Sequence, residues 1–498
     1  MSKRNIFIVT AALLLSNAMG GIDSTIVNTA MPAIIADLHG IEYMGWLVAI
    51  FLLGTAVSTP LWSKIGERLG NKRAYQLAAL FFVLGSFLQG RAPSMVFLII
   101  SRAIAGIGNG GMISLPYIIY AELYADPRRR MKVLGLVSAS FSTATIIGPL
   151  VGGYIVDNFG WHWVFYINVP IGLLSAILVQ IFFNEKKRAA NGRSVDYLGA
   201  GLLVVGLTVL LTATELIGET SAMTVLIMFV IAIIVLGVMM RVEIHAVDPI
   251  IPARIFRNRA LVVDFVMFMI IWGAFMGIVT YVPMWAQALL GTTALIGGAT
   301  QIPSSFANFG GSSLVAPLRS KISPQQVVAF GTWMLVIAFV IMVAMGVNGA
   351  YWMLLIAGFL QGFGNGMIFN ELQVKVQIDA VLQDVPAATS FSFLIRMLAQ
   401  TFTSSIFGII MNSALRKGVQ ASHGQITMAM MNKLSNSKSA KFLPQNLMPQ
   451  MRNIMHNGLH NIMMLSLLMM LVAAAINAWA LVDEKRQRDA KRSNVKAA

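Results

Sequence analysis

Long apolar stretches alternate with short polar connections along the whole of this sequence. An α-helix that crosses the hydrocarbon core of a bilayer needs about 20 apolar residues. Measured against that length, the pattern predicts fourteen spans, near residues 6–31, 42–62, 74–90, 94–120, 131–156, 162–183, 196–214, 222–240, 260–289, 293–317, 326–346, 350–372, 386–413 and 459–482. The expected fold class is an all-α integral membrane protein with both termini on the same side.

The composition of the 498 residues agrees with this class. Hydrophobic residues make up 57% of the chain and charged residues 11%, whereas soluble domains carry about 25% charged residues. The absence of cysteine removes a disulfide framework, a thiol nucleophile and cysteine-based metal sites. We expect no metal and no other cofactor, because the six histidines show no metal-ligand spacing: His39, His162, His245, His423, His456 and His460.

The location of the positive charges predicts the orientation. A net charge of +16 would suggest nucleic acid as the partner of a soluble protein. Here, with the N-terminus in the cytoplasm, 27 of the 36 Lys and Arg residues fall on the cytoplasmic side, seven fall outside, and Arg102 and Arg396 lie within spans. The positive-inside rule therefore favours a multi-pass cell-membrane protein with both termini in the cytoplasm and no nucleic-acid partner.

An internal repeat divides the chain into two halves. Ala105–Ile113 reads A-G-I-G-N-G-G-M-I and Gln361–Ile368 reads Q-G-F-G-N-G-M-I, an offset of 256 residues. Such an offset is too long for a solenoid and suits a duplicated helix bundle. We therefore expect a six-helix bundle over residues 1–190, an inserted helix pair over 191–245, and a second six-helix bundle over 246–498.

The long segment near 414–458 carries six of the seven outside charges and no acid. Ile426, Met430, Met431 and Leu434 have helical spacing, which predicts a short amphipathic helix on the outer surface. A solvated basic loop is the favoured interpretation, ahead of contact with anionic envelope material.

The stretch from residue 144 to residue 172 combines glycines, a proline and aromatic residues. Pro149 removes a backbone donor and predicts a bend, while Gly148 and Gly152 lie one turn apart, so a neighbouring helix can approach closely; Gly153 follows. After a turn come three aromatic residues typical of a membrane–water interface: Trp161, Trp163 and Tyr166. Both a bent packing helix and a rocking element of a transporter fit this pattern.

The same stretch resembles a known signature. The run A-T-I-I-G-P-L-V-G-G from Ala144 is similar to motif C, G-x-x-x-G-P-x-x-G-G, of antiporters in the major facilitator superfamily. The W-H-W-V-F-Y-I-N-V-P-I-G run after it, D-S-T-I-V-N-T-A-M-P from Asp23, and S-R-A-I-A-G-I-G-N-G around Arg102 resemble the 14-helix drug:proton antiporter branch. This resemblance covers essentially the whole chain and implies the major facilitator fold, with two six-helix bundles and two additional linker helices.

Charged residues inside the spans are the first candidates for function, because each costs roughly 2.5–3.5 kcal/mol at a helix centre. Asp23 is expected to carry the proton, unless it is a hydrated carboxylate at a helix end. Arg102 cannot readily lose a proton but can set the proton affinity of a nearby carboxylate; alternatively, it bonds to backbone groups at a packed interface. Glu371 is a third proton-coupling candidate, although a surface pair with Lys375 is the favoured interpretation. Asp264 is expected at the membrane interface.

The loop from Ser63 to Arg73 resembles motif A, G-x-L-x-D-R-x-G-R-K, of the same superfamily. Charge is kept at Glu67, Arg68 and Lys72, so an ionic latch between helix ends is expected, although such a charge run also suits a solvated cytoplasmic loop. Asn71 stands where the pattern has its later arginine.

Aromatic and uncharged polar residues are the candidates for a substrate cavity. Together with many methionines they suit a soft, adaptable site for bulky apolar or cationic compounds. The expected cavity residues are Trp46, Tyr281, Trp285, Gln287, Gln361 and Asn365.

These features predict a proton-coupled multidrug efflux antiporter that exports hydrophobic small molecules, cationic or zwitterionic, across the cytoplasmic membrane. The expected partners are these substrates, protons and the bilayer, and the expected state is a monomer. An exporter of one endogenous lipid or metabolite is the alternative in the same class. An integral-membrane enzyme is a remote alternative, since no nucleophile–base pair or metal cluster is evident. No G-x-x-x-x-G-K-[ST] loop occurs, so ion gradients are the expected energy source.

Overall fold

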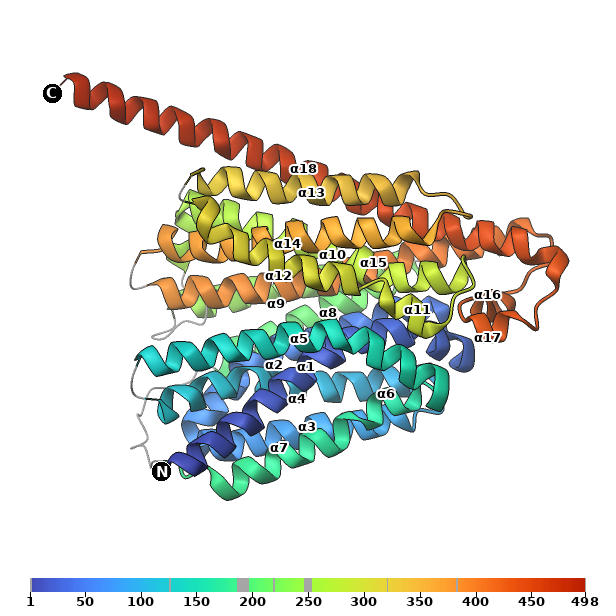
Figure 1. Ribbon diagram of the computed structural model, residues 1–498, viewed down its shortest axis with the longest axis horizontal. Helices are drawn as coiled ribbons and strands as arrows, with labels where there is room; N and C mark the ends of the chain where they lie inside the picture. Colours follow the sequence, from blue (N-terminus) through green and yellow to red (C-terminus); the bar gives the residue numbers. More distant parts are fainter. Residues whose placement is uncertain are drawn as a thin grey trace.

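The computed structural model describes residues 2–124, 127–185, 197–217, 220–245, 253–319, 321–381 and 384–497. Helices make up almost all of this part of the chain, and none of it forms a β-strand (Figure 1). In the first part these are α1 Lys3–Leu38, η1 Ile41–Tyr43, α2 Met44–Leu69, α3 Asn71–Gly90, α4 Met95–Leu123, α5 Pro127–Phe159, α6 His162–Tyr166, α7 Asn168–Phe182, α8 Tyr197–Glu215 and α9 Ala222–His245. They continue with η2 Ala253–Arg257, α10 Arg259–Ala288, α11 Ala294–Ala299, α12 Ile302–Arg319, α13 Pro324–Ala344, α14 Tyr351–Asp379, α15 Val385–Ala421, α16 Met428–Leu434, α17 Ser437–Ala440, η4 Gln445–Leu447 and α18 Met448–Ala497.

Short polar signals set several of these helix boundaries. Ser94 accepts a hydrogen bond from the backbone of Phe97 at the start of α4, and Ser323 forms a reciprocal capping box with Gln326 at the start of α13. Between α2 and α3 the chain turns at Gly70, whose φ of +91° lies in the region that favours glycine. These connections are short, so consecutive helices run antiparallel.

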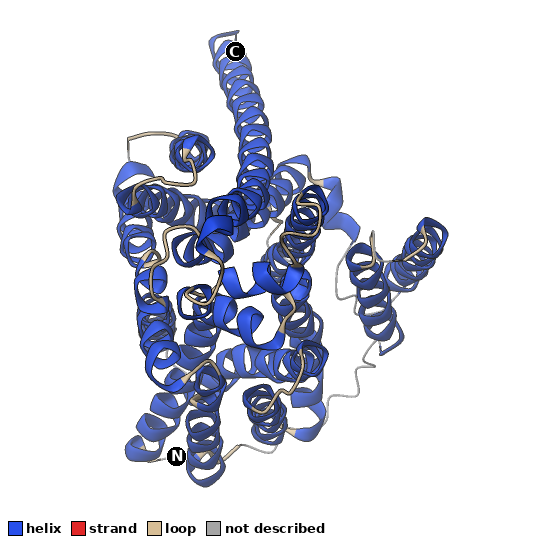
Figure 2. Cartoon of the chain, turned by 90° about the vertical axis from the view of Figure 1, so that its right-hand side faces the viewer, coloured by secondary structure: helices blue, strands red, loops and turns tan. Residues whose placement is uncertain are grey.

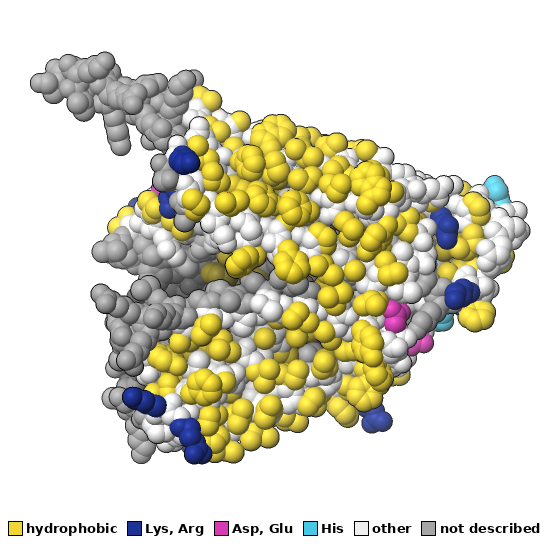
Figure 3. All heavy atoms as spheres, in the orientation of Figure 1, with side chains coloured by type: hydrophobic (Ala, Val, Ile, Leu, Met, Phe, Trp, Pro, Cys, Tyr) yellow, Lys and Arg dark blue, Asp and Glu magenta, His cyan; other side chains and the backbone are white. Residues whose placement is uncertain are grey.

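Ten helices in the described part of the chain are long and apolar enough to cross a membrane. On the face seen in Figure 3, hydrophobic side chains cover the middle of the molecule, and the visible charges gather toward its two ends. The protein is therefore a multi-pass membrane protein, and the predicted all-α membrane class is confirmed.

Two of the predicted spans consist of more than one helix. The span near 162–183 comprises α6 and α7, which meet at Ile167. The span near 293–317 comprises α11 and α12, and the interruption is at Thr300 and Gln301. The sequence signal for this interruption was Pro303, since proline is favoured in the first turn of a new helix.

The helices form two groups, seen nearly end-on in Figure 2. Helices α1 to α7 pack mainly with one another, as do α10 to α18, and the groups meet through α1 with α10, α2 with α15, and α5 with α11. Helices α8 and α9 pack against each other, with α8 also touching α2 and α15. The predicted boundaries near 190 and 245 fall in or beside stretches outside the described residues.

The two groups share a continuous hydrophobic core at one end. We name the end that carries α6, α11 and α16 the closed end, and the opposite end, where α1 begins, the terminal end. One continuous core joins Ile34 and Met44 of the first group to Trp285 and Met431 of the second. Near the start of α1 the first group has a separate core, which includes Val9. Between the groups at the terminal end the surface is hollowed (Figure 3).

The segment near 414–458 is mostly helical and packs onto the bundle. Helices α15 and α18 extend into it, and the predicted short helix is present as α16, with Met431 and Leu434 buried. Asn432 of α16 accepts a buried hydrogen bond of 3.2 Å from the backbone N–H of Ile41 in the other group. The interpretation of this segment as a solvated loop is therefore wrong for its central part, because the apolar face of α16 is covered by the bundle.

Candidate functional site

Asp23 lies in the middle of α1 and is only 2% exposed. Its Oδ1 accepts a hydrogen bond of 2.8 Å from the side-chain amide of Asn168 at the start of α7, while its Oδ2 has no hydrogen-bond partner within the described chain. The interpretation of Asp23 as a hydrated carboxylate at a helix end is wrong, because α1 continues for fifteen residues beyond it, to Leu38. One oxygen of a buried carboxylate is thus left available.

Arg102 lies on α4 and is buried beside this carboxylate. Its Nε donates to the backbone carbonyl of Leu47 at 2.7 Å, its Nη1 donates to Gln89 at 3.3 Å, and its guanidinium lies 4.4 Å from the ring centroid of Phe51. Arg102 and Asp23 also interact electrostatically, without a direct hydrogen bond. The interpretation that Arg102 bonds to backbone groups at a packed interface is therefore confirmed, whereas its role in setting the proton affinity of Asp23 stays a prediction.

Asn168 was not among the residues singled out in the sequence. It is buried, and its Oδ1, like the Oδ2 of Asp23, has no hydrogen-bond partner within the described chain. A polar residue inside the apolar run V-F-Y-I-N-V-P-I-G was the available signal, because a buried amide needs a partner. Its pairing with Asp23 depends on α1 lying against α7.

The glycines of α5 allow close contacts with two different helices. A side chain at Gly148 would meet Thr25, and one at Gly152 would meet Ile26 at 2.5 Å, so both glycines face α1. Gly153 faces the backbone of Leu295 in α11, and Gly298 of α11 in turn faces the carbonyl of Pro149. Helix α5 therefore packs between the helix that carries Asp23 and the opposite group of helices.

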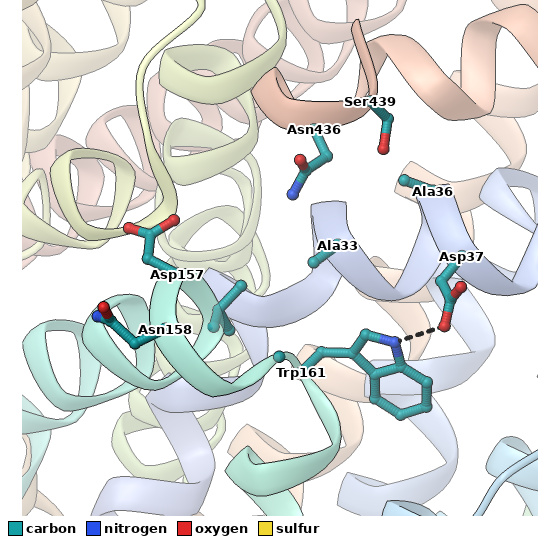
Figure 4. A pocket seen from close by; sticks show the side chains of 10 residues that line it. Ala33, Ala36, Asp37, Asp157, Asn158, Trp161, Asn436 and Ser439 are labelled. Carbon is teal, nitrogen blue, oxygen red and sulfur yellow. Dashed lines mark hydrogen bonds between the residues drawn. The ribbon is translucent and has the colours of Figure 1, made fainter.

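Polar contacts join the two groups at the closed end. The carboxylate of Asp157 in α5 accepts a hydrogen bond of 3.0 Å from the backbone N–H of Leu295, and Gln287 of α10 donates to the carbonyl of Thr29 at 3.3 Å. Beside them lies a pocket of about 360 Å³ (Figure 4). Its lining includes Asp37, which accepts a hydrogen bond of 2.9 Å from Trp161. Trp161 is thus a buried packing residue, whereas Trp163 is the exposed aromatic of this turn.

Three buried charges of the second group, Asp264, Glu371 and Lys375, take part in two clusters of ion pairs. Glu371 is fully buried, and its Oε1 lies 3.2 Å from the Nε of Arg319. Lys375 lies 3.2 Å from the Oδ1 of Asp264 and 3.3 Å from the Oδ2 of Asp379. The predicted surface pair of Glu371 with Lys375 is therefore wrong, because Glu371 is fully buried and pairs with Arg319. Asp264, five residues into α10, is 1% exposed, and its placement at the membrane interface stays a prediction. Helices α10, α12 and α14 meet at these clusters. Arg319 and Asp264 lie on other helices than Glu371 and Lys375, so residue spacing within one helix could not predict these pairs.

Comparison with known proteins identifies this architecture. A family model described as Major Facilitator Superfamily matches residues 13–404. The chain belongs to this superfamily. It is a membrane transporter and not an enzyme.

Two relatives and one solved structure illustrate this similarity. The chain is 30% identical to Multidrug resistance protein 3 of Bacillus subtilis, over 81% of this chain and 79% of that protein. It is 27% identical to Multidrug export protein EmrB of Escherichia coli, over 80% of this chain and 79% of that protein. In fold it is similar to a bacterial homologue of the human lysosomal transporter Spinster in an inward-facing, unoccupied conformation, with a TM-score of 0.68, 14% identity, and coverage of 96% and 97% of the two chains.

The carboxylates of Glu185 and Glu122, neither of them a predicted latch residue, bind the α2–α3 turn of this transporter. Backbone N–H groups of Asn71 and Lys72 donate to the carboxylate of Glu185, just after α7, at 2.5 and 3.3 Å. The side-chain amide of Asn71 donates to Glu122 of α4 at 2.7 Å. Of the predicted latch residues, Arg68 is exposed and Lys72 half-buried, while the side chain of Glu67 lies outside the described part. Asn71, which departs from the superfamily pattern, therefore bridges helices here.

The predicted cavity residues of this transporter lie on three helices. Trp46 of α2 is half-buried and packs against a hydrophobic cluster that includes residues of α8 and α9. The others are buried in α10 and α14. Among the described side chains, polar atoms without a hydrogen-bond partner occur on four of these five residues: Trp285 Nε1, Gln287 Oε1, Gln361 Nε2 and Asn365 Oδ1.

The ion pairs in the second group generate a stability prediction. The substitution Asp264→Asn removes one partner of a buried lysine, so we expect the free energy of unfolding to fall by up to about 3 kcal/mol. The double variant Asp264→Asn/Lys375→Gln should recover part of this loss, because no buried charge is left unpaired. Thermal unfolding of the purified protein measures both. Additive losses in the double variant would contradict a direct pairing.

Proposed function

We propose that this transporter is a proton-coupled antiporter that exports hydrophobic small molecules across the cytoplasmic membrane. The observation that supports it best is Asp23, a buried carboxylate with one available oxygen, next to Arg102 and on a helix in contact with α5. The names of the relatives, a multidrug resistance protein and a multidrug export protein, support the substrate class. The expectation of cationic or zwitterionic substrates stays a prediction.

In the proposed cycle Asp23 carries the proton. A carrier must hold its proton when it faces one side and release it toward the other. Burial favours the protonated carboxyl and a nearby cation favours the ionised form, so small movements of α1 relative to α4 change its proton affinity. In this proposal Arg102 provides the cation, and Asn168 holds one oxygen of the carboxylate while the other exchanges the proton.

Helix α5 links the carrier to the closed end. Gly148 and Gly152 hold α5 against α1 one turn from Asp23, and Gly153 holds it against α11 of the other group. A shift of α1 on proton uptake would therefore alter the packing that keeps the closed end shut. A transition of this kind needs two packed arrangements whose balance the proton changes.

The energy released by one entering proton is sufficient to export a solute against its concentration gradient. A membrane potential contributes about 2.3 kcal/mol per charge per 100 mV, so one proton entering can drive useful export of a neutral solute.

Glu371 is a further candidate for proton coupling, although in our proposal its pairing with Arg319 gives it a mainly structural role. We also propose that the terminal end faces the cytoplasm, that the repeat divides the chain near residues 190 and 245, and that the α2–α3 turn latches the terminal end.

The first functional prediction concerns the carrier. In proteoliposomes, Asp23→Asn should abolish export driven by a pH gradient, because an amide cannot exchange a proton, while substrate binding stays measurable. Glu42→Gln, which removes a nearby carboxylate just after α1, serves as the matched control and should transport normally. Wild-type rates for Asp23→Asn under a pH gradient would show that another group carries the proton.

The second prediction concerns the close packing of α5. The substitution Gly152→Val places a side chain into Ile26, so transport should fall at least about tenfold while the protein still reaches the membrane. Gly237→Val is the matched control, because Gly237 lies in helix α9 with no atom within 4 Å of the added carbon. Normal transport by Gly152→Val would show that this contact is not required for transport.

The third prediction concerns orientation and uses the absence of cysteine. Phe442, which is 86% exposed at the closed end, should react as Phe442→Cys with a membrane-impermeant maleimide added to intact cells. Arg73→Cys, in the first turn of α3, should react only after the membrane is opened. The reverse pattern of labelling would overturn the proposed orientation.

A further inference from the structure

Arg396 lies on α15 inside a cage of aromatic rings. Its side chain is 8% exposed. The guanidinium carbon lies 5.6 and 5.2 Å from the ring centroids of Phe268 and Trp272 in α10, 4.7 Å from that of Phe369 in α14, and 4.3 Å from that of Phe393 in α15. Four rings from three helices therefore contact one cation.

Arg396 forms no hydrogen bond and no ion pair with any residue in the described ranges. The other buried cations of this protein have such partners. Arg102 donates to Leu47 and Gln89, and Lys375 pairs with Asp264, one turn before Phe268. Asp264 is therefore already engaged. Aromatic rings stabilise a buried cation, but they leave its five N–H donors without acceptors.

We propose that Arg396 and the four rings bind the anionic group of the transported substrate, a carboxylate on an aromatic or apolar body. This assignment rests on the proposed export function and deepens it. A guanidinium presents paired N–H donors that match the two oxygens of a carboxylate, and the rings supply the apolar contact for the body. An organic cation at the same place would meet a like charge. The site thus selects amphipathic anions, or zwitterions through their acidic end.

The charge of the substrate changes the energetics of exchange. When one proton enters for each monovalent cation exported, no net charge crosses the membrane, so the membrane potential contributes no free energy. When one proton enters for each monovalent anion exported, both movements follow an inside-negative potential, and the cycle is strongly driven by voltage. Transport of an anion should therefore accelerate with membrane potential.

The test uses three ligands with one aromatic body and different charge: 1-naphthoate, neutral 1-naphthamide and cationic 1-naphthylmethylammonium. Calorimetric titration of the purified full-length protein should show naphthoate binding at least about tenfold more tightly than the amide. Arg396→Gln should abolish that preference, and Arg396→Lys should keep it in weaker form. The matched control is Arg259→Gln, because Arg259 lies 4.6 Å from the Trp479 ring on the exposed start of α10 and should bind as wild type does.

The outcomes separate this site from proton coupling. Binding is measured without any gradient, so a naphthoate preference that Arg396→Gln removes supports the site even if Asp23→Asn proteoliposomes show that the proposed coupling fails. Equal binding of the three ligands by the wild type would overturn the site, as would an unchanged preference in folded Arg396→Gln. If Arg396→Gln does not fold, Arg396→Lys decides, since an affinity for naphthoate equal to that of the wild type would contradict recognition by the guanidinium fork. In proteoliposomes, naphthoate export that ignores a potassium–valinomycin potential would contradict transport as an anion.

Discussion

The close contact of α5 with α1 and α11 is the constraint on which the arrangement of this transporter depends. Two of its glycines face α1 and a third faces α11, so α5 contacts both within two turns. In a bilayer, helix association gains little from the hydrophobic effect and relies on close packing, so small residues determine where backbones meet. Ile26, which Gly152 faces, belongs to the shared core of the closed end, and Asp23 lies three residues before it on the same helix.

Buried charge is handled differently in the two groups of helices. In the first group, Asp23 and Arg102 influence each other at a distance, and each is held by neutral partners. In the second, Glu371 and Lys375 have direct ionic partners, which neutralise their charge inside the protein. A charge with a direct ionic partner is costly to change, whereas a carboxylate without one can exchange a proton at smaller structural cost. The two groups of helices therefore stabilise buried charge by different chemistry.

Arg396 differs from both kinds of buried charge, those held by neutral hydrogen-bond partners and those with an ionic partner. It is as buried as the paired charges, yet its described neighbours are aromatic rings. Cation–π contacts hold the guanidinium in place without consuming its hydrogen-bond donors, which is an arrangement suited to a ligand that arrives and leaves. The sequence predicted hydrophobic substrates, cationic or zwitterionic, from aromatic and methionine content and from the family resemblance, and this prediction did not take the charge of Arg396 into account.

The sequence by itself determined the all-α membrane class, because the length and polarity of a span are local properties that a bilayer imposes on each helix separately. It also singled out Asp23, Arg102 and the glycines of α5, since an intramembrane charge or a glycine pair is unusual wherever it packs. Only the tertiary structure decided which groups meet: Asn168 with Asp23, Arg319 with Glu371, Asp264 with Lys375, and four rings with Arg396. These pairings join helices that are distant in the chain, and they depend on the rotation and depth of each helix, which hydrophobic periodicity determines too coarsely to bring two side chains within hydrogen-bonding distance.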